Sequence, residues 1–474
     1  MEETSPLIYW IRRDLRLTDH PGLDAARQSG RPVIPVFILD PETEGIGAAP
    51  KWRLGLGIDA FRTRLEEIDS GLVLRRGKAL DVLRALVEET GAGAVHWTRL
   101  YDPAAIKRDT AVKEALREDG VEAESRPGHV LFEPWTVETK SGGDYYKVYS
   151  PFWRAVDGID VGPCLERIED LPAPEKWPVS DAMEDWSLGA AMQRGAEVVL
   201  PHVCVGEDAA RGRLERFLDD AVLDYAGDRD RLDLDGTSGL SENFTYGELS
   251  VREAWHAAGR HMNGQSKGPG TFRKEIAWRE FAYHLIYHTP HLVERPWREE
   301  WTDFPWREDS EDAERWRRGM TGETVVDAAM RELFITGRMH NRARMIVASY
   351  LTKHLMTDWR VGMDWFADCL IDWDPASNAL GWQWTAGCGP DAAPFFRVFN
   401  PETQGEKYDP DGAYRRRYLL GFDGSEDEVA ASYFDAVPRS WDLDRDTPAP
   451  ERMVGLKEGR TRALDAYSAF KDEH

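Results

Sequence analysis

The stretch Pro-Val-Ile-Pro-Val-Phe-Ile-Leu at residues 32–39 is a compact apolar run. Uninterrupted runs of this length are typical of strands that are buried on both faces of a parallel sheet. Shorter or similar runs occur at residues 7–13, 72–74 and 94–97, and helical patterns at residues 54–68, 79–89 and 104–118 lie between them. Strands that alternate with helices indicate parallel βαβ units. We therefore predict a doubly wound α/β domain over residues 1–133.

Polar residues follow several of these predicted strands. Asp14, Asp40 and Tyr101–Asp102 come directly after apolar runs. Because open α/β sheets bind ligands outside the carboxyl ends of their strands, we expect these residues at a ligand-binding edge.

The rest of the chain has two parts that differ in composition and in hydrophobic periodicity. Residues 134–205 are rich in Pro, Gly and Asp and predict a long interdomain connector, with Tyr145–Trp153 as its apolar anchor. From residue 206 onward helical periods dominate, at residues 209–225, 251–263, 270–288, 322–336, 341–357 and 362–372. We predict a larger all-helical domain over residues 206–474.

Composition narrows the class of protein. No window approaches the roughly 20 apolar residues that a membrane span requires, and the N-terminus lacks the features of a signal peptide, so we expect a cytoplasmic protein without membrane segments. The four cysteines form no Cys-x-x-Cys pair and no His clusters with them, which predicts reduced thiols and no metal site.

Charge is distributed unevenly. The formal net charge is −25, which by itself argues against nucleic-acid binding, but net charge does not describe a local groove. Ten cations gather between residues 334 and 418: Arg338, Arg342, Arg344, Lys353, Arg360, Arg397, Lys407, Arg415, Arg416 and Arg417. A soluble or salt-adapted surface explains the excess of acidic residues but not the clustering of these basic residues. A basic patch on an acidic body predicts binding that depends strongly on salt.

Three motifs in the helical part carry most of the chemical information. They are Thr-Gly-Arg-Met-His-Asn-Arg-Ala-Arg-Met (336–345), Ile-Asp-Trp-Asp-Pro-Ala-Ser-Asn-Ala-Leu-Gly-Trp-Gln-Trp (371–384) and Phe-Arg-Val-Phe-Asn-Pro-Glu-Thr-Gln-Gly-Glu-Lys-Tyr (396–408). With Trp-Ile-Arg-Arg-Asp-Leu-Arg-Leu-Thr-Asp (10–19), they resemble the class I DNA photolyases of the photolyase/cryptochrome family. The resemblance runs from about residue 7 to about residue 418.

The resemblance implies that FAD is the cofactor. Thr237, Ser238, Gly239, Leu240 and Ser241 form a hydroxyl-rich turn that suits a phosphate, although a helix cap explains the same pattern. The family binds the FAD phosphates with this loop, and Tyr225 and Arg229 precede it at the expected places. Further cofactor contacts implied are Phe272, Arg279, Asn341, Arg344, Asp372, Trp373, Asp374 and Asn378.

Four of these residues are expected around the flavin ring. Asn341 and Arg344 are three residues apart, so they share one helix face. The resemblance implies that Arg344 pairs with Asp372 beside the ring and that Asn378 faces flavin N5. An amide there can accept a hydrogen bond from N5–H but cannot readily supply a proton, which favours the reduced anionic FAD that repair needs. Without the resemblance, Ser-Asn-Ala around Asn378 predicts only a turn.

The chain has 19 tryptophans, and most are expected to be packing anchors. The resemblance assigns Trp382, Trp359 and Trp306 to a chain along which an electron passes from the surface to the flavin. Together with Glu275 and Asn378 they form the predicted catalytic set.

The segment 274–281 resembles the family's lesion-binding helix. A damaged base pair inside a duplex has to be flipped out before chemistry, and aromatic faces then hold it. The resemblance implies that Glu275 binds the paired thymines and that Trp278 and Trp384 stack on them. The remaining DNA contacts implied are Arg229, Arg279, Asn341, Arg342, Met345, Arg397, Gln404 and Lys407.

Two residues bear on the type of lesion. Enzymes that repair (6-4) products carry histidines where this chain has Asn341 and Met345. We therefore expect light-driven repair of cyclobutane pyrimidine dimers, a carbon–carbon lyase activity on ultraviolet-damaged DNA, by a monomer. The alternatives are a (6-4) photolyase, a cryptochrome-type photoreceptor and a plain flavoprotein oxidoreductase.

A second, antenna chromophore is the family's other expected ligand. Folate-binding relatives carry Asn and Glu at the positions of Ala104 and Ala105. Folate is therefore disfavoured, and a deazaflavin, another flavin or an empty pocket remain open.

Overall fold

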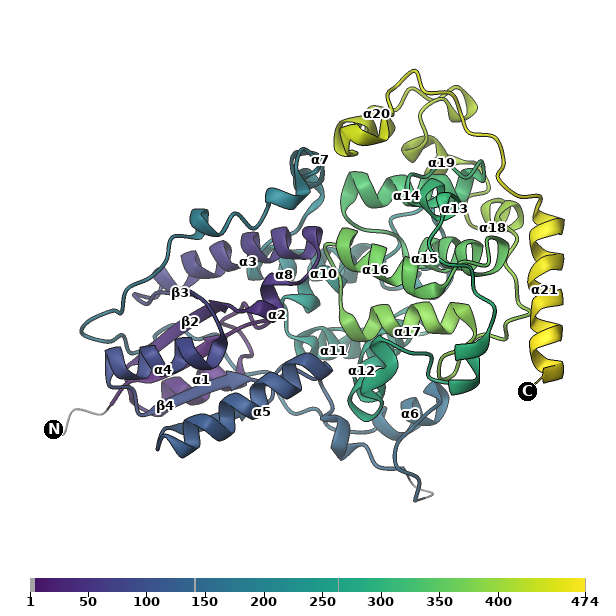
Figure 1. Ribbon diagram of the computed structural model, residues 1–474. Helices are drawn as coiled ribbons and strands as arrows, with labels where there is room; N and C mark the ends of the chain where they lie inside the picture. Colours follow the sequence, from purple (N-terminus) through teal and green to yellow (C-terminus); the bar gives the residue numbers. More distant parts are fainter. Residues whose placement is uncertain (1–4, 140–141, 263, 474) are drawn as a thin grey trace.

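The computed structural model describes residues 5–139, 142–262 and 264–473. A sheet with helices on both faces lies beside a larger group of helices, and the last helix lies on the far side of that group from the sheet (Figure 1). This arrangement confirms the predicted combination of an α/β domain and a helical domain. The predicted domain bounds, 1–133, 134–205 and 206–474, stay predictions.

The sheet has five parallel strands in the order β3-β2-β1-β4-β5. The strands are β1 (Leu7–Ile11), β2 (Val33–Leu39), β3 (Val73–Arg76), β4 (Ala94–Thr98) and β5 (Glu122–Arg126). The helices among them are α1 (Pro21–Gln28), α2 (Pro41–Glu44), α3 (Ala48–Glu66), α4 (Ala79–Thr90) and α5 (Pro103–Glu118). Because β1 lies between β2 and β4, the chain order reverses direction there, and the carboxyl ends of β1 and β4 form the switch point of the sheet.

Strand β1 is buried along its whole length because helices cover both of its faces. Leu7, Tyr9 and Ile11 pack into one core cluster, which also contains residues of α1 and α3. Ile8 and Trp10 pack on the opposite face, in a cluster with residues of α4 and α5. This two-sided burial is the physical reason for the continuous apolar runs in the sequence.

The chain between the sheet and the helical region is irregular and packs on both. Its helices include α6 (Tyr149–Val156) and α7 (Gly195–Val199). The amide of Val33 donates to the carbonyl of Pro172 at 2.7 Å, and Ile168 and Trp186 complete the core under α3. The segment therefore runs back along the sheet rather than bridging the two domains freely.

The helical region contains the predicted helices and several more. They are α8 (Glu207–Asp220), α9 (Tyr225–Asp228), α10 (Ser241–Thr245), α11 (Val251–Arg260), α12 (Gly268–His288), α13 (Glu311–Arg317), α14 (Thr324–Thr336), α15 (Asn341–Ser349), α16 (Trp359–Cys369), α17 (Pro375–Ala386), α18 (Pro401–Tyr408), α19 (Ala413–Tyr418), α20 (Glu428–Ala436) and α21 (Leu456–Glu473). No helix among the described residues is both long and apolar enough to cross a bilayer.

Four predicted helices of the helical region end earlier than their patterns suggested, two of them, α11 and α16, by only three residues. The helix predicted over residues 209–225 ends at Asp220, and α9 starts only at Tyr225. The helix predicted over residues 341–357 changes into a π-helical turn at Tyr350–His354. Such turns insert one extra residue per turn and occur frequently at functional sites.

The interpretation of Asn378 as a turn residue was wrong, because it lies inside α17. Asp374 caps this helix by accepting a hydrogen bond from the amide of Ser377 at 2.8 Å, and Pro375 occupies the first turn. An acidic cap followed by proline is a strong helix start, and it overrides the turn preference of Ser and Asn.

Buried ion pairs connect α3 to the helical region. Arg53 is fully buried and pairs with Glu242 at 2.6 Å and with Glu248 at 2.7 Å. Arg213 also pairs with Glu242, at 3.1 Å, so two arginines match the two carboxylates and no charge is left unpaired, which is the condition for burying them. The contact fixes the segment that precedes α11 against the sheet domain.

Candidate cofactor and substrate site

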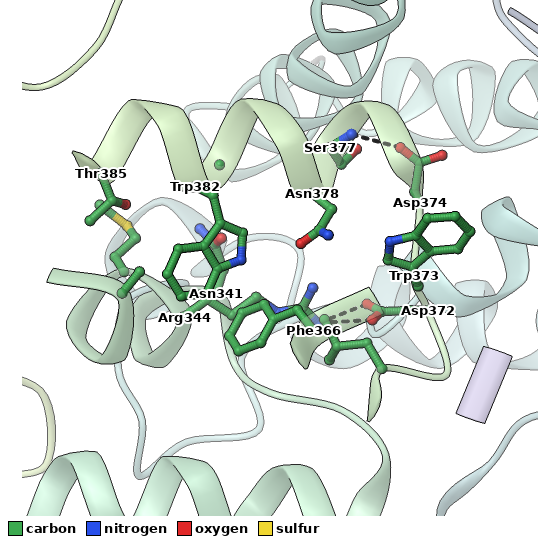
Figure 2. Close-up of a pocket in the computed structure, with 14 residues that line it drawn as sticks. Asn341, Arg344, Phe366, Asp372, Trp373, Asp374, Ser377, Asn378, Trp382 and Thr385 are labelled. Carbon is green, nitrogen blue, oxygen red and sulfur yellow. Dashed lines mark hydrogen bonds and ion pairs between the residues drawn. The ribbon is translucent and has the colours of Figure 1, made fainter. Parts of the chain in front are cut away.

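A cavity opens between α15, α16 and α17 (Figure 2). It contains about 620 Å³ of empty space, part of it open to solvent. Eight residues predicted from the sequence line it: Asn341, Arg344, Met345, Asp372, Trp373, Asp374, Asn378 and Trp382. The sequence reasoning missed Ala348, Phe366, Leu370, Ser377, Gly381 and Thr385, which are mostly small or apolar and complete the wall.

An arginine–carboxylate pair forms one side of the cavity. Nη2 of Arg344 lies 3.0 and 2.8 Å from the two carboxylate oxygens of Asp372, and Nε of Arg344 donates to the carbonyl of Met339 at 2.8 Å. Asp372 is almost completely buried and also accepts a hydrogen bond from the hydroxyl of Ser241 at 2.6 Å. The pair therefore has a fixed orientation and is tied to the hydroxyl-rich turn at residues 237–241.

Asn378 presents an acceptor to the cavity. Its Nδ2 donates to the carbonyl of Met363 at 3.0 Å, and this bond sets the orientation of the amide. The Oδ1 atom is left without a donor among the described residues, and Figure 2 shows the side chain pointing into the cavity from α17. A guest with an N–H group at this place would donate a hydrogen bond to Oδ1 of Asn378, and the amide has no acidic proton to give in return.

Asp374 is held by a chain of buried hydrogen bonds that the sequence did not reveal. The hydroxyl of Tyr283 on α12 donates to Oδ2 of Asp374, and Nε2 of His129 lies 2.8 Å from the same hydroxyl. Burial and the nearby Asp374 charge raise the pKa of Tyr283, while burial and the surrounding arginines lower the pKa of His129. Tyr283 therefore keeps the proton that it donates to Asp374, and His129 stays neutral beside it.

The turn at residues 237–241 has the donors that a phosphate requires. Gly239 has a φ of +61°, a conformation that a side chain would strain. In the described part of the chain, the backbone N–H groups of Thr237, Ser238 and Gly239 donate no hydrogen bond. Free amides beside hydroxyl groups fit the diphosphate of a dinucleotide.

The three tryptophans predicted for electron transfer differ in their exposure, and their order along an electron path stays a prediction. Trp382 lines the cavity, and a Cβ added to Gly362 on α16 would lie 2.0 Å from its ring, so α16 and α17 are in close contact there. Trp359 is the first residue of α16 and is 1% exposed. Trp306 is partly exposed, and the neighbouring Arg307 is bridged to Thr357.

Two of the residues predicted to bind the lesion or the DNA, Glu275 on α12 and Arg342 on α15, are held in place by ion pairs. Glu275 forms an ion pair with Arg229, and burial raises the pKa of Glu275 although Arg229 opposes that shift. Arg342 pairs with Asp230 at 2.7 Å and lies over the ring of Tyr408. The predicted DNA contacts Arg397 and Lys407 are exposed, whereas Trp384 and Gln404 are partly buried.

Three predicted cofactor residues outside the turn lie away from the cavity wall, and the first, Tyr225, packs edge-on against Phe272 with ring centroids 5.7 Å apart. Phe272 is 3% exposed and packs against Phe217 with ring centroids 4.7 Å apart. Arg279 donates to Glu280 at 2.8 Å and to the carbonyl of His129 at 3.0 Å. None of the three is among the residues that line the cavity, so the structure gives them no direct contact with a guest there.

The switch point of the sheet is filled by charged side chains. Arg12, which follows β1, donates to the carbonyl of Thr98 at the end of β4 and pairs with Asp109 at 2.6 Å. The guanidinium groups of Arg12 and Arg108 lie 4.5 and 4.8 Å from the ring centre of Trp10. A chromophore at this edge would have to contact or displace these side chains, and its presence and identity stay predictions.

The acids predicted at this edge are present there but have local partners. Asp40 caps α2 through the amide of Thr43 at 2.9 Å and pairs with Arg108 at 2.7 Å. Asp102 caps α5 through the amide of Ala105 at 3.0 Å. The fold already uses these carboxylates, which removes the main reason to expect a ligand beside them.

One group of possible metal ligands occurs among the described residues, on β4 and β5. It consists of His96, Glu122 and Glu124, with His96 3.1 Å from Glu122. Arg31 pairs with Glu122 at 3.1 Å and Arg126 pairs with Glu124. Because both carboxylates already have a cationic partner, the group does not suit a metal ion.

Comparisons with known proteins agree with this geometry. Residues 7–175 match the family described as DNA photolyase, and residues 272–469 match the FAD binding domain of DNA photolyase. A deoxyribodipyrimidine photo-lyase of Agrobacterium fabrum is 44% identical over 478 residues, which cover 99% of each chain.

Two solved structures are also similar over nearly the whole chain. A bacterial class III photolyase from Agrobacterium tumefaciens has 43% identity and a TM-score of 0.92, with 100% of this chain and 99% of that chain covered. An archaeal photolyase from Sulfolobus tokodaii, solved with two FAD molecules, has 26% identity and a TM-score of 0.81, with 98% and 100% covered. The first of these does not support the class I assignment made from the sequence. The matched domains and the 44% identical relative show that this chain belongs to the photolyase/cryptochrome family.

Proposed function

We propose that this protein is an FAD-dependent photolyase that uses light to split cyclobutane pyrimidine dimers in DNA. The observation that carries the proposal is the free amide oxygen of Asn378, which faces a cavity bounded by the Arg344–Asp372 pair. Relatives named deoxyribodipyrimidine photo-lyase, at high coverage, support the same activity. When bound, reduced FAD supplies the photoexcited electron for repair, and the protein supplies orientation and electrostatics.

The residues around the cavity have complementary roles in this proposal. Asn378 accepts a hydrogen bond from the N5–H edge of the ring without offering a proton, because its own amide protons point to Met363. Arg344, held by Asp372, neutralises negative charge on the ring. The amides and hydroxyls of residues 237–241 bind the diphosphate, and Ser241 links them to Asp372.

The substrate side of the site lies on α12 and around the mouth of the cavity. Glu275 binds the dimer, and its raised pKa allows it to donate a hydrogen bond when protonated. Trp278 and Trp384 stack on the extruded bases at roughly 1–3 kcal/mol per base. Met345 on the cavity wall gives the dimer an apolar contact, and the absence of His at the positions of Asn341 and Met345 favours cyclobutane dimers over (6-4) products.

Three finer properties are the photolyase class, the antenna chromophore and the oligomeric state. We place the enzyme nearer the class III than the class I photolyases, since a class III structure is 43% identical over the whole chain. An antenna chromophore at the sheet edge would contact Arg12, Arg108 and Trp10, and its identity stays a prediction. The enzyme is proposed to act on ultraviolet-damaged DNA as a monomer.

The decisive experiment measures dimers in irradiated DNA. Purified protein with a chemical reductant should remove cyclobutane dimers from an oligonucleotide under blue light and leave them intact in the dark. The same assay on (6-4) products should show no repair. Protein that binds flavin but repairs neither lesion would favour a cryptochrome-type photoreceptor instead. Dark turnover of a redox substrate would favour a flavoprotein oxidoreductase.

A further inference from the structure

A second arginine stands beside the turn at residues 237–241. Nη1 of Arg338, which follows the end of α14, lies 3.4 Å from the position that a Cβ on Gly239 would occupy. Arg213 approaches the same glycine, and its Nη1 donates to the carbonyl of Gly239 at 2.8 Å. Glycine at residue 239 thus lets two guanidinium groups approach the backbone of the turn.

The two arginines differ in their partners. Arg213 is paired with Glu242 at 3.1 Å. The guanidinium of Arg338 makes no hydrogen bond or ion pair with the described residues, although it is only partly exposed. Glu332 interacts with the charge of Arg338, but it accepts its hydrogen bonds from the hydroxyl of Tyr414 at 2.6 Å and the amide of His340 at 3.2 Å.

The surroundings of Arg338 are cationic. Burial lowers the pKa of His202, and the charges of Arg338 and Arg417 lower it further, so these three side chains lie close enough to interact. Glu332 also interacts with the charge of Arg338, but its carboxylate makes its hydrogen bonds to other groups, so the positive charges of Arg338 and Arg417 still repel each other. An anionic guest between Arg338 and the turn would remove that repulsion.

The free donors of the turn indicate which anion fits. The amides of residues 237–239 and the hydroxyls of Thr237 and Ser238 are short, rigid donors, and a guanidinium adds a planar pair of donors that matches phosphate oxygens. Ser241 joins the turn to Asp372 on the cavity wall, so the turn lies beside the cavity.

We propose that Arg338 is a cofactor-binding residue that contacts the diphosphate of FAD at the Gly239 turn. This inference rests on the proposed function for the identity of the cofactor. Two other roles would explain an arginine here. Arg338 could contact the DNA backbone as part of the basic run at residues 334–418, or it could only stabilise the fold around Glu332.

The test compares Arg338→Met with Arg338→Lys and with the control Arg417→Met, which removes a neighbouring charge that has no contact with the turn. The release of FAD from the purified holoprotein is followed as the increase in flavin fluorescence after dilution, at several NaCl concentrations. Riboflavin, which lacks phosphate, is titrated into the flavin-free full-length chain. Affinity for undamaged duplex DNA is measured on the holoprotein.

We expect Arg338→Met to weaken FAD binding about tenfold or more, because a charge-assisted hydrogen bond is lost. Its FAD release should also become less sensitive to salt. Arg338→Lys should recover part of the loss, and Arg417→Met should change FAD release less than twofold. Riboflavin and DNA affinity should remain those of the wild type.

Other outcomes would overturn the inference. Unchanged FAD release in Arg338→Met excludes a diphosphate contact, and a parallel loss of riboflavin binding assigns Arg338 to the fold instead. Weakened DNA binding with normal FAD release assigns it to the substrate. If the wild-type protein itself binds no FAD, the proposed function fails rather than the role of Arg338 within it.

Discussion

Tyr149 stacks face to face on Trp278, with ring centroids 3.7 Å apart and an interplanar angle of 6°. The hydroxyl of Tyr149 donates to the carbonyl of Lys274, one turn earlier on α12, at 2.7 Å. The connector thus covers one face of the indole and leaves Trp278 only partly buried. A rigid indole with one covered face is a suitable platform for an extruded base.

Tyr149→Ala is expected to weaken binding of dimer-containing DNA, because the indole loses the ring that fixes its orientation. An aromatic pair contributes about 0.5–1.5 kcal/mol beyond burial, which corresponds to roughly a two- to tenfold loss of affinity. Fluorescence anisotropy with damaged and undamaged oligonucleotides measures this change. Tyr149→Phe is the matched control, since it keeps the stack and loses only the bond to Lys274. Equal binding by wild type and Tyr149→Ala would remove this role.

Tyr283 is expected to position Asp374 at the cavity. Tyr283→Phe removes the donor to a buried carboxylate and leaves it short of one partner, at a cost of about 1–3 kcal/mol. We expect a lower melting temperature and faster FAD release, because Asp374 caps the helix that carries Asn378. Tyr350→Phe is a matched control: Tyr350 is also completely buried, but its hydroxyl has no partner among the described residues. If both variants released FAD equally fast, the Tyr283–Asp374 bond would have no special role.

The sequence predicted the sheet well where strands are buried on both faces. The runs at residues 7–13 and 32–39 correspond to β1 and β2. Helices cover both faces of these strands, so every side chain is buried and the sequence is continuously apolar. Strand β5 was missed: its sequence, Glu-Ala-Glu-Ser-Arg, is polar because it lies at the edge of the sheet with only Ala123 fully buried. An edge strand has no continuous apolar signal to detect.

The residues of the site could likewise be predicted only where a local sequence pattern marks them. Arg344 and Asp372 were paired only through the family resemblance, and the structure places them in contact, whereas α17 could have been predicted from Asp374-Pro375. The Tyr283–Asp374 and His129–Tyr283 bonds join residues 91 and 154 positions apart. No local pattern encodes such pairs, because they depend on how α12 and the connector pack.

Trp382→Phe is expected to slow the light-driven reduction of the bound flavin at least tenfold, since phenylalanine is much harder to oxidise than indole. Absorbance during blue illumination with an external electron donor measures this rate. Repair by chemically reduced protein should change little, because it does not use the chain of tryptophans. Trp316→Phe is the control: Trp316 lies 6.1 Å from Trp382 in an edge-on contact and is completely buried. An equal effect of the two substitutions would indicate damage to packing rather than a broken electron path.

Lys353 should make stability depend on pH in the alkaline range. This side chain is 1% exposed in the π-helical turn, and its Nζ donates to the carbonyl of Arg397 at 3.1 Å. Burial, and to a smaller extent the charge of Arg397, lowers the pKa of Lys353 from 10.5 to about 7. Between these values the unfolded chain binds a proton that the folded protein does not, so stability rises from about pH 7 to about pH 10.5.

Lys353→Met removes this titration at nearly constant volume. We expect the variant to be more stable than the wild type at pH 7, and the difference in melting temperature to shrink as the pH rises toward 10. Thermal unfolding of both proteins at four pH values measures it, with Lys78→Met, a substitution outside the helical region, as the control. The same variant frees the carbonyl of Arg397 and should weaken DNA binding if that loop contacts the substrate. A constant difference in melting temperature across this range would show that Lys353 stays charged in the folded protein.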